Sequence, residues 1–204
     1  MYARSTTIKG DPANVDAVIA FVRDEVMPMI TSMDGCLGLS LVVDRESGRG
    51  IATSSWDSKE ALDESRDSLA PVRARGGEIL GGTPEVDEWE VAMMHRDHHT
   101  GVGACCRVTW GRVPDVDRAV GFFRDEVLPK AEGMNGFCNA SLFIDRSTNR
   151  FTTTVTFDSH EALAESRTKA AGIRSHAGDR IGAEFLDIAE FDLELAHLHL
   201  PELV

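Results

Sequence analysis

Hydrophobic and polar positions change their period several times within the first hundred residues. Residues 2–9 are rich in Thr and Ile, which is typical of a strand. A helix is predicted from about Pro12 to Met33, because apolar residues recur there at helical spacing and form one stripe. Pro28 lies near the end of this helix and is expected to kink or tighten its last turn. The stripe consists of Val15, Val18, Ile19, Val22, Val26 and Ile30.

A hairpin, a second helix and a last strand follow. Two strands, at about residues 36–44 and 50–56, are joined by a turn at residues 45–49. Ser58 is a suitable N-cap for a helix that runs through about residue 75. The last strand, at about residues 85–95, alternates between apolar and acidic positions, as a strand with one buried face does. Its apolar face carries Trp89, Val91 and Met93, and its polar face carries Glu88 and Glu90.

The whole pattern occurs twice. The segment that begins at Phe21 recurs 101 residues later at Phe122, and the segment at Trp56 recurs at Phe157 with the same offset. The order βαββαβ in each copy predicts a four-stranded antiparallel sheet with both helices on one face. Two such sheets are expected to bury their bare faces against each other. The predicted fold class is therefore α+β, with two tandem ferredoxin-like βαββαβ modules that form an intrachain dimeric α/β barrel. The domains are placed at residues 1–97 and 104–200.

Charge and composition exclude several classes of partner. The net charge of −13 would repel nucleic acid and anionic membrane surfaces. No stretch approaches the roughly 20 apolar residues of a membrane span, and the N-terminus has no apolar core of a signal peptide, so a cytoplasmic location is expected. The cysteines form no C-x-x-C pair and are expected to be free, buried thiols. They are Cys36, Cys105, Cys106 and Cys138.

Several motifs are similar to those of the antibiotic biosynthesis monooxygenase family. The similarity runs from Gly35-Cys36, through the hairpin that ends in Trp56, to the segment Ser58–Leu62. The second copy carries the same signature at Gly136 and from Phe157 to Leu163. The resemblance covers nearly all of both repeats and implies a dimeric α+β barrel. It implies no single activity, because the superfamily includes cofactor-free quinone-forming monooxygenases, heme-degrading enzymes and proteins with no established reaction.

The resemblance also bears on heme. Many family members carry a histidine on the second helix, three residues after the Glu-Ala-Leu segment, and heme-degrading relatives use an axial histidine there. Ser65 and Ser166 occupy that position here, and a serine hydroxyl does not replace an imidazole as an iron ligand. His176 is the nearest substitute, with Arg75 at its place in the first copy. We therefore expect no heme and no other cofactor.

Two arginines at matched positions are candidates for binding an anion. Arg4 and Arg107 lie on the first strand of each copy, and the neighbouring last strand carries Glu88 or Glu190. If these side chains face the barrel interior, the arginines supply fixed donors to an anionic or polar aromatic ligand. The alternative is a structural ion-pair network, because buried charge must be paired.

Other candidates are weaker. Small and polar residues on the hairpin strands, including Asn139, leave room for a small organic ligand; ordinary solvated strand faces are the alternative. Trp56 can stack on an aromatic ring, although a tryptophan at a strand end is more often part of the core. Five of the seven histidines lie in the linker and near the end of the chain; they fit no closed zinc pattern and have no evident second-shell partner, so no metal site is expected. They are His95, His98, His99, His197 and His199.

Two hypotheses of function remain open. In the first, the chain is a cofactor-independent monooxygenase whose barrel holds a small aromatic substrate. Arg4, Arg107 and Asn139 would stabilise the substrate anion and Trp56 would hold its ring. In the second, it is a non-catalytic small-ligand-binding or stress-related barrel protein. The expected partners are a small aromatic or anionic molecule and, as an open alternative, further copies of the chain in a homo-oligomer.

Overall fold

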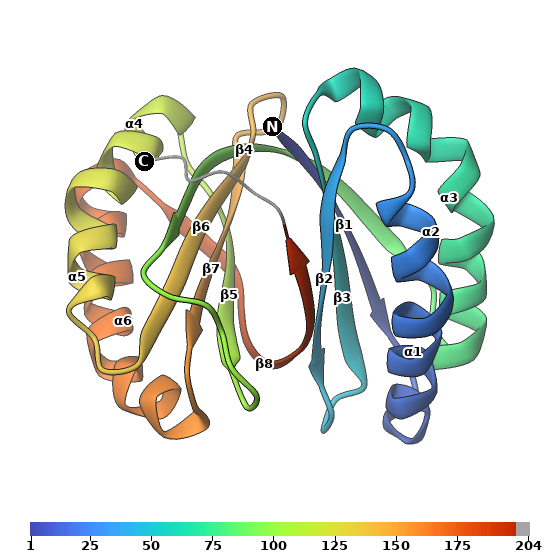
Figure 1. Ribbon diagram of the computed structural model, residues 1–204. Helices are drawn as coiled ribbons and strands as arrows, with labels where there is room; N and C mark the ends of the chain where they lie inside the picture. Colours follow the sequence, from blue (N-terminus) through green and yellow to red (C-terminus); the bar gives the residue numbers. More distant parts are fainter. Residues whose placement is uncertain (199–204) are drawn as a thin grey trace. The chain divides into compact units, whose positions relative to one another are not determined.

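The computed structural model describes residues 1–198 (Figure 1). Its hydrogen-bonded strand order is β1-β3-β2-β8-β5-β7-β6-β4, and this order closes as a barrel, which confirms the predicted fold class. The first repeat contains β1 (Tyr2–Lys9), η1 (Pro12–Asn14), α1 (Val15–Phe21), η2 (Val22–Val26), α2 (Met27–Thr31), β2 (Cys36–Asp44), β3 (Arg49–Trp56), α3 (Lys59–Leu80) and β4 (Glu85–Arg96). The second contains β5 (Cys105–Arg112), α4 (Val116–Phe122), η3 (Phe123–Val127), α5 (Leu128–Glu132), β6 (Phe137–Asp145), β7 (Arg150–Phe157), α6 (His160–Ile181) and β8 (Glu184–Leu198).

The chain forms two compact units, and each last strand is divided between them. The first unit comprises Met1–Trp89 and the stretch that begins at Asp192, and the second comprises Glu90–Phe191. From Glu90 onward β4 pairs antiparallel with β6, within the second unit. From Asp192 onward β8 pairs antiparallel with β2, within the first unit. The compact units therefore differ from the sequence repeats in the second half of each last strand.

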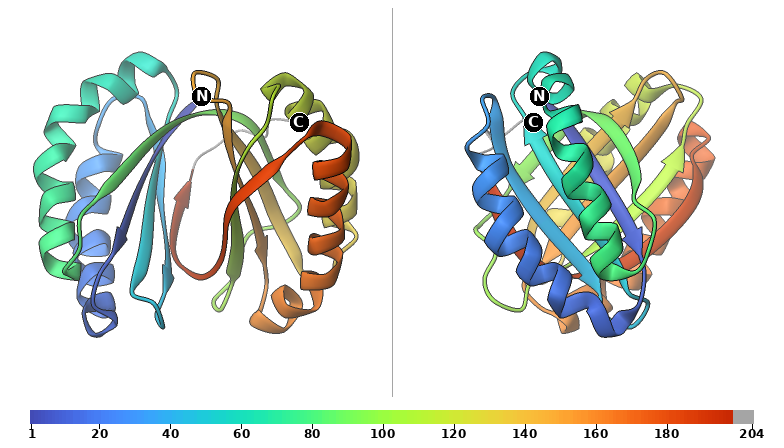
Figure 2. Two further views of the ribbon diagram at one scale, coloured as in Figure 1. Left: turned by 180° about the vertical axis from the view of Figure 1, so that it is seen from behind. Right: turned by 90° about the vertical axis from the view of Figure 1, so that its right-hand side faces the viewer.

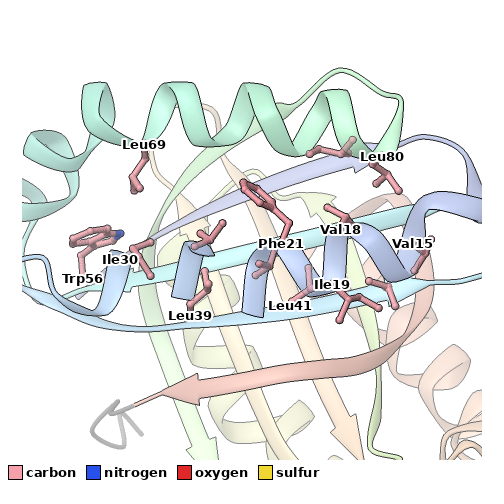
Figure 3. Packing of buried hydrophobic residues seen from close by; sticks show 14 of the residues in the cluster. Val15, Val18, Ile19, Phe21, Ile30, Leu39, Leu41, Trp56, Leu69 and Leu80 are labelled. Atoms are coloured by element: carbon pink, nitrogen blue, oxygen red, sulfur yellow. The ribbon is translucent and has the colours of Figure 1, made fainter. Parts of the chain in front are cut away.

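Both helical segments of a unit cover the same face of its sheet. Figure 2 shows α3 beside the α1–η2–α2 segment, over the sheet of β1, β3 and β2. The buried side chains of this layer form the core of the first unit (Figure 3). Trp56 and Leu62 are fully buried in it, with no exposed surface. Within residues 1–198, no helix is both long and apolar enough to cross a membrane.

The first helix of each repeat contains a π-helical turn that the sequence did not predict. In η2 the N–H of Met27 donates to the carbonyl of Val22, five residues earlier, just before Pro28. Proline has no N–H to donate, and its ring would clash with the carbonyl four residues earlier in a regular helix. The wider turn accommodates both effects. The same turn, η3, precedes Pro129 in the second repeat.

The second helix of the first repeat begins where predicted and ends later. The Oγ of Ser58 accepts a hydrogen bond from the N–H of Ala61, as an N-cap does. The helix was expected to end near residue 75, but it continues past Gly76 and Gly77 to Leu80. It ends at Gly81, whose φ of 84° is the left-handed conformation that glycine adopts without steric cost.

Candidate functional site

Arg4 is buried against the second helix of its repeat. Only 2% of its surface is exposed. Its Nη1 donates to the Oγ of Ser65 at 2.8 Å, and its Nη2 donates to the carbonyl of Leu62 at 2.7 Å. Its Nε and Nη2 both donate to Glu88, at 3.1 and 2.8 Å. All three guanidinium nitrogens are therefore engaged with the protein.

Arg107 repeats this arrangement in the second unit. It donates to Ser166 at 2.9 Å, to the carbonyl of Leu163 at 3.1 Å and to Glu190 at 2.7 Å. The sequence left two alternatives for these residues: a ligand site, if their side chains face the barrel interior, or a structural ion-pair network. The structure holds each arginine on the helix-covered face, because a serine hydroxyl and a backbone carbonyl of α3 or α6 accept its hydrogen bonds there. These contacts are those of two structural ion-pair networks.

The two serines have a structural role that the sequence did not indicate. Ser65 Oγ donates to the carbonyl of Leu62 at 2.7 Å while it accepts from Arg4, and Ser166 does the same with Leu163. The position where heme-degrading relatives carry histidine thus supports the buried arginine here. His176 lies elsewhere on α6, with its Nε2 3.0 Å from a carboxylate oxygen of Glu126.

The two glutamates are held in the charged form. Partial burial by itself raises the pKa of Glu88, but hydrogen bonds from Arg4 and Arg66 outweigh it, so the pKa lies below its usual range. The same balance of burial against Arg167 and Arg107 lowers the pKa of Glu190. A carboxyl group with a lowered folded-state pKa stabilises the fold above its unfolded pKa of about 4.3. That stabilisation is lost as the pH falls through the folded-state pKa.

The lowered pKa values of Glu88 and Glu190 predict that acid lowers the stability of the fold through these two carboxyl groups. The free energy of unfolding of the wild type should fall between pH 7 and about pH 3, because the folded-state pKa values of Glu88 and Glu190 lie below about 4.3. In the double variant Glu88→Gln and Glu190→Gln it should be lower at pH 7 and should fall less, because the amides do not take up a proton. Urea denaturation at both pH values measures this. Glu64→Gln, an exposed change on α3, serves as control; equal pH dependence in all three proteins would contradict the assignment.

Each unit also contains a mostly apolar cavity between its sheet and its helices. The cavity of the first unit has a volume of about 80 Å³ and that of the second about 100 Å³. The π-helical turns contribute to both walls, through Val22 and Val26 in one and Phe123 and Val127 in the other. Such turns often occur at functional sites. We call these spaces the helix–sheet cavities.

A second arginine lines each helix–sheet cavity beside the first. In the first unit it is Arg73, whose Nη2 donates to the carbonyl of Arg66 at 3.0 Å. Its Nη1 is buried and has no hydrogen-bond partner. Burial first, and then the positive charge of Arg4, lower the pKa of Arg73. Arg174 is its counterpart in the second unit, with its pKa lowered by burial and by Arg107.

An unpartnered, buried guanidinium N–H carries a desolvation cost that a bound anion would remove. Arg73 is therefore the feature of the first cavity that best fits a ligand, and Arg174 has the equivalent position in the second. It escaped sequence analysis because a lone arginine on a helix is usually solvated. The repeat nevertheless pointed to this arginine, since Arg73 and Arg174 are 101 residues apart, which is the offset between the two copies.

The remaining sequence candidates do not line the helix–sheet cavities. Trp56 is fully buried in the core, and its Nε1 donates to the Oγ of Ser54 at 3.0 Å. Asn139 lies on β6, where it pairs with Arg96 of β4 and Thr156 of β7. Their roles in ligand binding stay predictions. His199 lies outside the described residues.

A cluster that the sequence did not predict lies at one end of the second sheet. The side chains of His98, Cys138 and Asp158 place one nitrogen, one sulfur and one oxygen atom within 4.8 Å of one another. Burial, and then the carboxylate of Asp158, raise the pKa of Cys138 to about 12. In the absence of a metal the thiol is therefore protonated at neutral pH and is a poor nucleophile.

Comparisons with known proteins agree with this architecture. The model of the family described as "Antibiotic biosynthesis monooxygenase" matches residues 1–75. The uncharacterized protein Rv2557 of Mycobacterium tuberculosis is 49% identical over 206 residues, which span 100% of this chain and 92% of the relative.

Two solved structures share the fold at low sequence identity. A candidate monooxygenase from Lactobacillus acidophilus is 12% identical and has a TM-score of 0.67, over 97% of this chain and 96% of its own. An anthrone oxidase-like protein is 13% identical and has a TM-score of 0.65, over 99% and 94%. The two structures agree with the fold, whereas the matched family model and the full-length relative place the protein: the chain belongs to the antibiotic biosynthesis monooxygenase family.

Proposed function

We propose that the chain is a cofactor-independent monooxygenase that binds a small aromatic anion in its helix–sheet cavities. The buried, unpartnered Nη1 of Arg73 carries this proposal. Arginine holds a phenolate or enolate oxygen with charge-assisted hydrogen bonds, and the apolar walls would hold the ring. The site differs from the barrel interior that the sequence suggested.

The chemistry follows from stabilising the substrate anion. A methylene next to an aromatic carbonyl loses a proton to give an enolate, which is the electron-rich species that reacts with O₂. One oxygen atom forms the new carbonyl, the other leaves as water, and the methylene carbon supplies all four electrons. The guanidinium lowers the energy of the enolate by holding its oxygen. No carboxylate or imidazole lines either cavity among the described residues, so the substrate would arrive ionised or lose its proton to water.

A non-catalytic binding role is the second candidate, and the cavity volumes favour it. At about 80 and 100 Å³, both are smaller than the ~150 Å³ cavity that holds benzene in an engineered protein. They are also well below the ~300 Å³ of typical ligand pockets. An aromatic substrate therefore requires the α1–η2–α2 segment or its counterpart to move outward. A smaller apolar acid would bind with less movement.

One experiment separates these functions. Wild-type protein is titrated with a panel of small phenols, hydroxyaromatic ketones and aromatic acids, and oxygen uptake is followed for each one that binds. Loss of a charge-assisted hydrogen bond costs about 1.5–3 kcal/mol, so Arg73→Met and Arg174→Met together should weaken binding by roughly 10- to 100-fold. Arg180→Met, an exposed change on α6, is the matched control.

Each outcome decides a point. Binding with oxygen uptake, both reduced in the double variant, supports the monooxygenase. Binding without oxygen uptake, for every compound that binds, supports the non-catalytic role. Binding that the double variant leaves unchanged, or no binding at all, contradicts the placement of the site at these arginines.

A further inference from the structure

The cluster of His98, Cys138 and Asp158 is held together by backbone contacts from three separate elements. Cys138 lies in a β-bulge of β6. Its carbonyl accepts from the N–H of Asp97 at 2.8 Å and of His98 at 3.4 Å, in the segment that follows β4. Asp158 follows β7, and its N–H donates to the carbonyl of Gly136 at 2.8 Å. The three side chains therefore converge because the backbone fixes each of them, as a preorganised site requires.

The side-chain atoms already lie near the spacing of a metal coordination sphere. Asp158 Oδ1 is 3.0 Å from His98 Nε2 and 3.1 Å from Cys138 Sγ. Ligand atoms of a tetrahedral zinc ion lie about 2.0–2.3 Å from the metal and hence roughly 3.3–3.6 Å from one another. The third pair, His98 Nε2 and Cys138 Sγ, lies within 4.8 Å, so side-chain movements that leave the backbone in place would bring all three atoms to the ion.

A fourth residue orients the histidine. Asp97 Oδ2 lies 2.8 Å from His98 Nδ1. A carboxylate at Nδ1 fixes the tautomer that leaves Nε2 free to coordinate, which is the usual arrangement behind a metal-binding histidine. The sequence showed no such second-shell partner, because the role of Asp97 depends on where His98 points.

We propose that His98 Nε2, Cys138 Sγ and Asp158 Oδ1 bind one zinc ion, with Asp97 positioning His98. Thiolate and imidazole ligands favour zinc over Mg²⁺ and Ca²⁺. Thiolate and carboxylate together balance the charge of the ion, and the thiol proton is released on binding. His98 and Asp158 are partly exposed, so solvent can supply the fourth ligand. The proposal is independent of the proposed function.

The first repeat lacks the site, which fixes the expected stoichiometry. Asp57 occupies the place of Asp158 and makes the same backbone contact, its N–H donating to the carbonyl of Gly35 at 2.9 Å. Leu37, however, stands where the second repeat has Cys138, so no thiolate is available. One zinc ion per chain is therefore expected.

The test uses untagged full-length protein and the metal alone. Zinc is titrated against a competing chelator, and Co²⁺ is added separately because a cobalt–thiolate bond gives an intense charge-transfer absorption. We expect saturation at one ion per chain with the thiolate band present. His98→Gln and Asp158→Asn, at partly exposed positions, should each weaken zinc binding at least tenfold. Asp97→Asn should weaken it about 10- to 100-fold.

Controls separate this site from adventitious binding. Cys36→Ser and Asp57→Asn in the first repeat should leave affinity and stoichiometry unchanged. Cys138→Ser should remove the thiolate band. Far-UV circular dichroism checks whether this variant is folded. If it does not fold, the variants at His98 and Asp158 still test the site. Absence of saturable zinc binding, cobalt binding without the thiolate band, or unchanged affinity in His98→Gln and Asp158→Asn would each overturn the proposal.

Discussion

Replacement of Arg107 by methionine is expected to lower the free energy of unfolding by about 3 kcal/mol, the lower end of the range for breaking a buried ion pair. Methionine fills part of the space but donates no hydrogen bond. Glu190 loses one of its two arginines, and the carbonyl of Leu163 loses a donor. Glu190 remains 26% exposed and keeps Arg167, which is why a larger loss is not expected.

Urea denaturation followed by circular dichroism measures this effect. Arg124→Met is the matched control, because Arg124 forms an exposed pair with its neighbour Asp125, and such pairs contribute little, about 0–1 kcal/mol. Adding Glu190→Gln to Arg107→Met should recover part of the loss, since the partly buried carboxylate that lost one of its two arginines is then gone. A loss below about 1 kcal/mol would mean that the network contributes little to stability. No recovery in the double variant would mean that the loss comes from the contacts to Ser166 and Leu163 and not from Glu190.

The fold could be predicted from the sequence because the hydrophobic pattern of each helix and strand occurs twice along the chain. Alternation in the last strands and the 101-residue offset specify two βαββαβ modules, and bare sheet faces then favour a barrel. The π-helical turns could not be predicted, because the spacing of Val18, Val22 and Val26 also fits a regular helix. Only the effect of Pro28 on the backbone selects the wider turn.

The candidate sites were harder to predict, because they depend on where side chains point. Arg4 and Arg107 were candidates either for ligand binding or for ion pairs with glutamate. Their direction depends on Ser65 and Ser166, which the sequence showed only as replacements for a family histidine. The buried Nη1 of Arg73 is a property of packing and leaves no pattern along the chain. His98, Cys138 and Asp158 come from three elements, so no spacing rule connects them.

Replacement of Trp56 by alanine is expected to lower the free energy of unfolding by about 3–5 kcal/mol, the usual cost of removing a large buried aromatic side chain. Trp56 packs with Ile30, Leu39 and Leu69 in the core of the first unit (Figure 3). It has no exposed surface, and its indole N–H is satisfied by Ser54. The cavity left by alanine would therefore be bounded by a fixed sheet and by α3, which limits collapse.

Two further variants distinguish this role from ring stacking on a ligand. Trp56→Phe keeps most of the volume but leaves Ser54 without its donor, so a loss of about 1–2 kcal/mol is expected. Phe157, the equivalent residue of the second repeat, is also fully buried, and Phe157→Ala should lower stability as strongly as Trp56→Ala. Urea denaturation gives all three values. If Trp56→Ala instead left stability near that of the wild type while it weakened binding of the aromatic panel, Trp56 would be a ligand-binding residue, because a core side chain cannot be removed without a loss of stability.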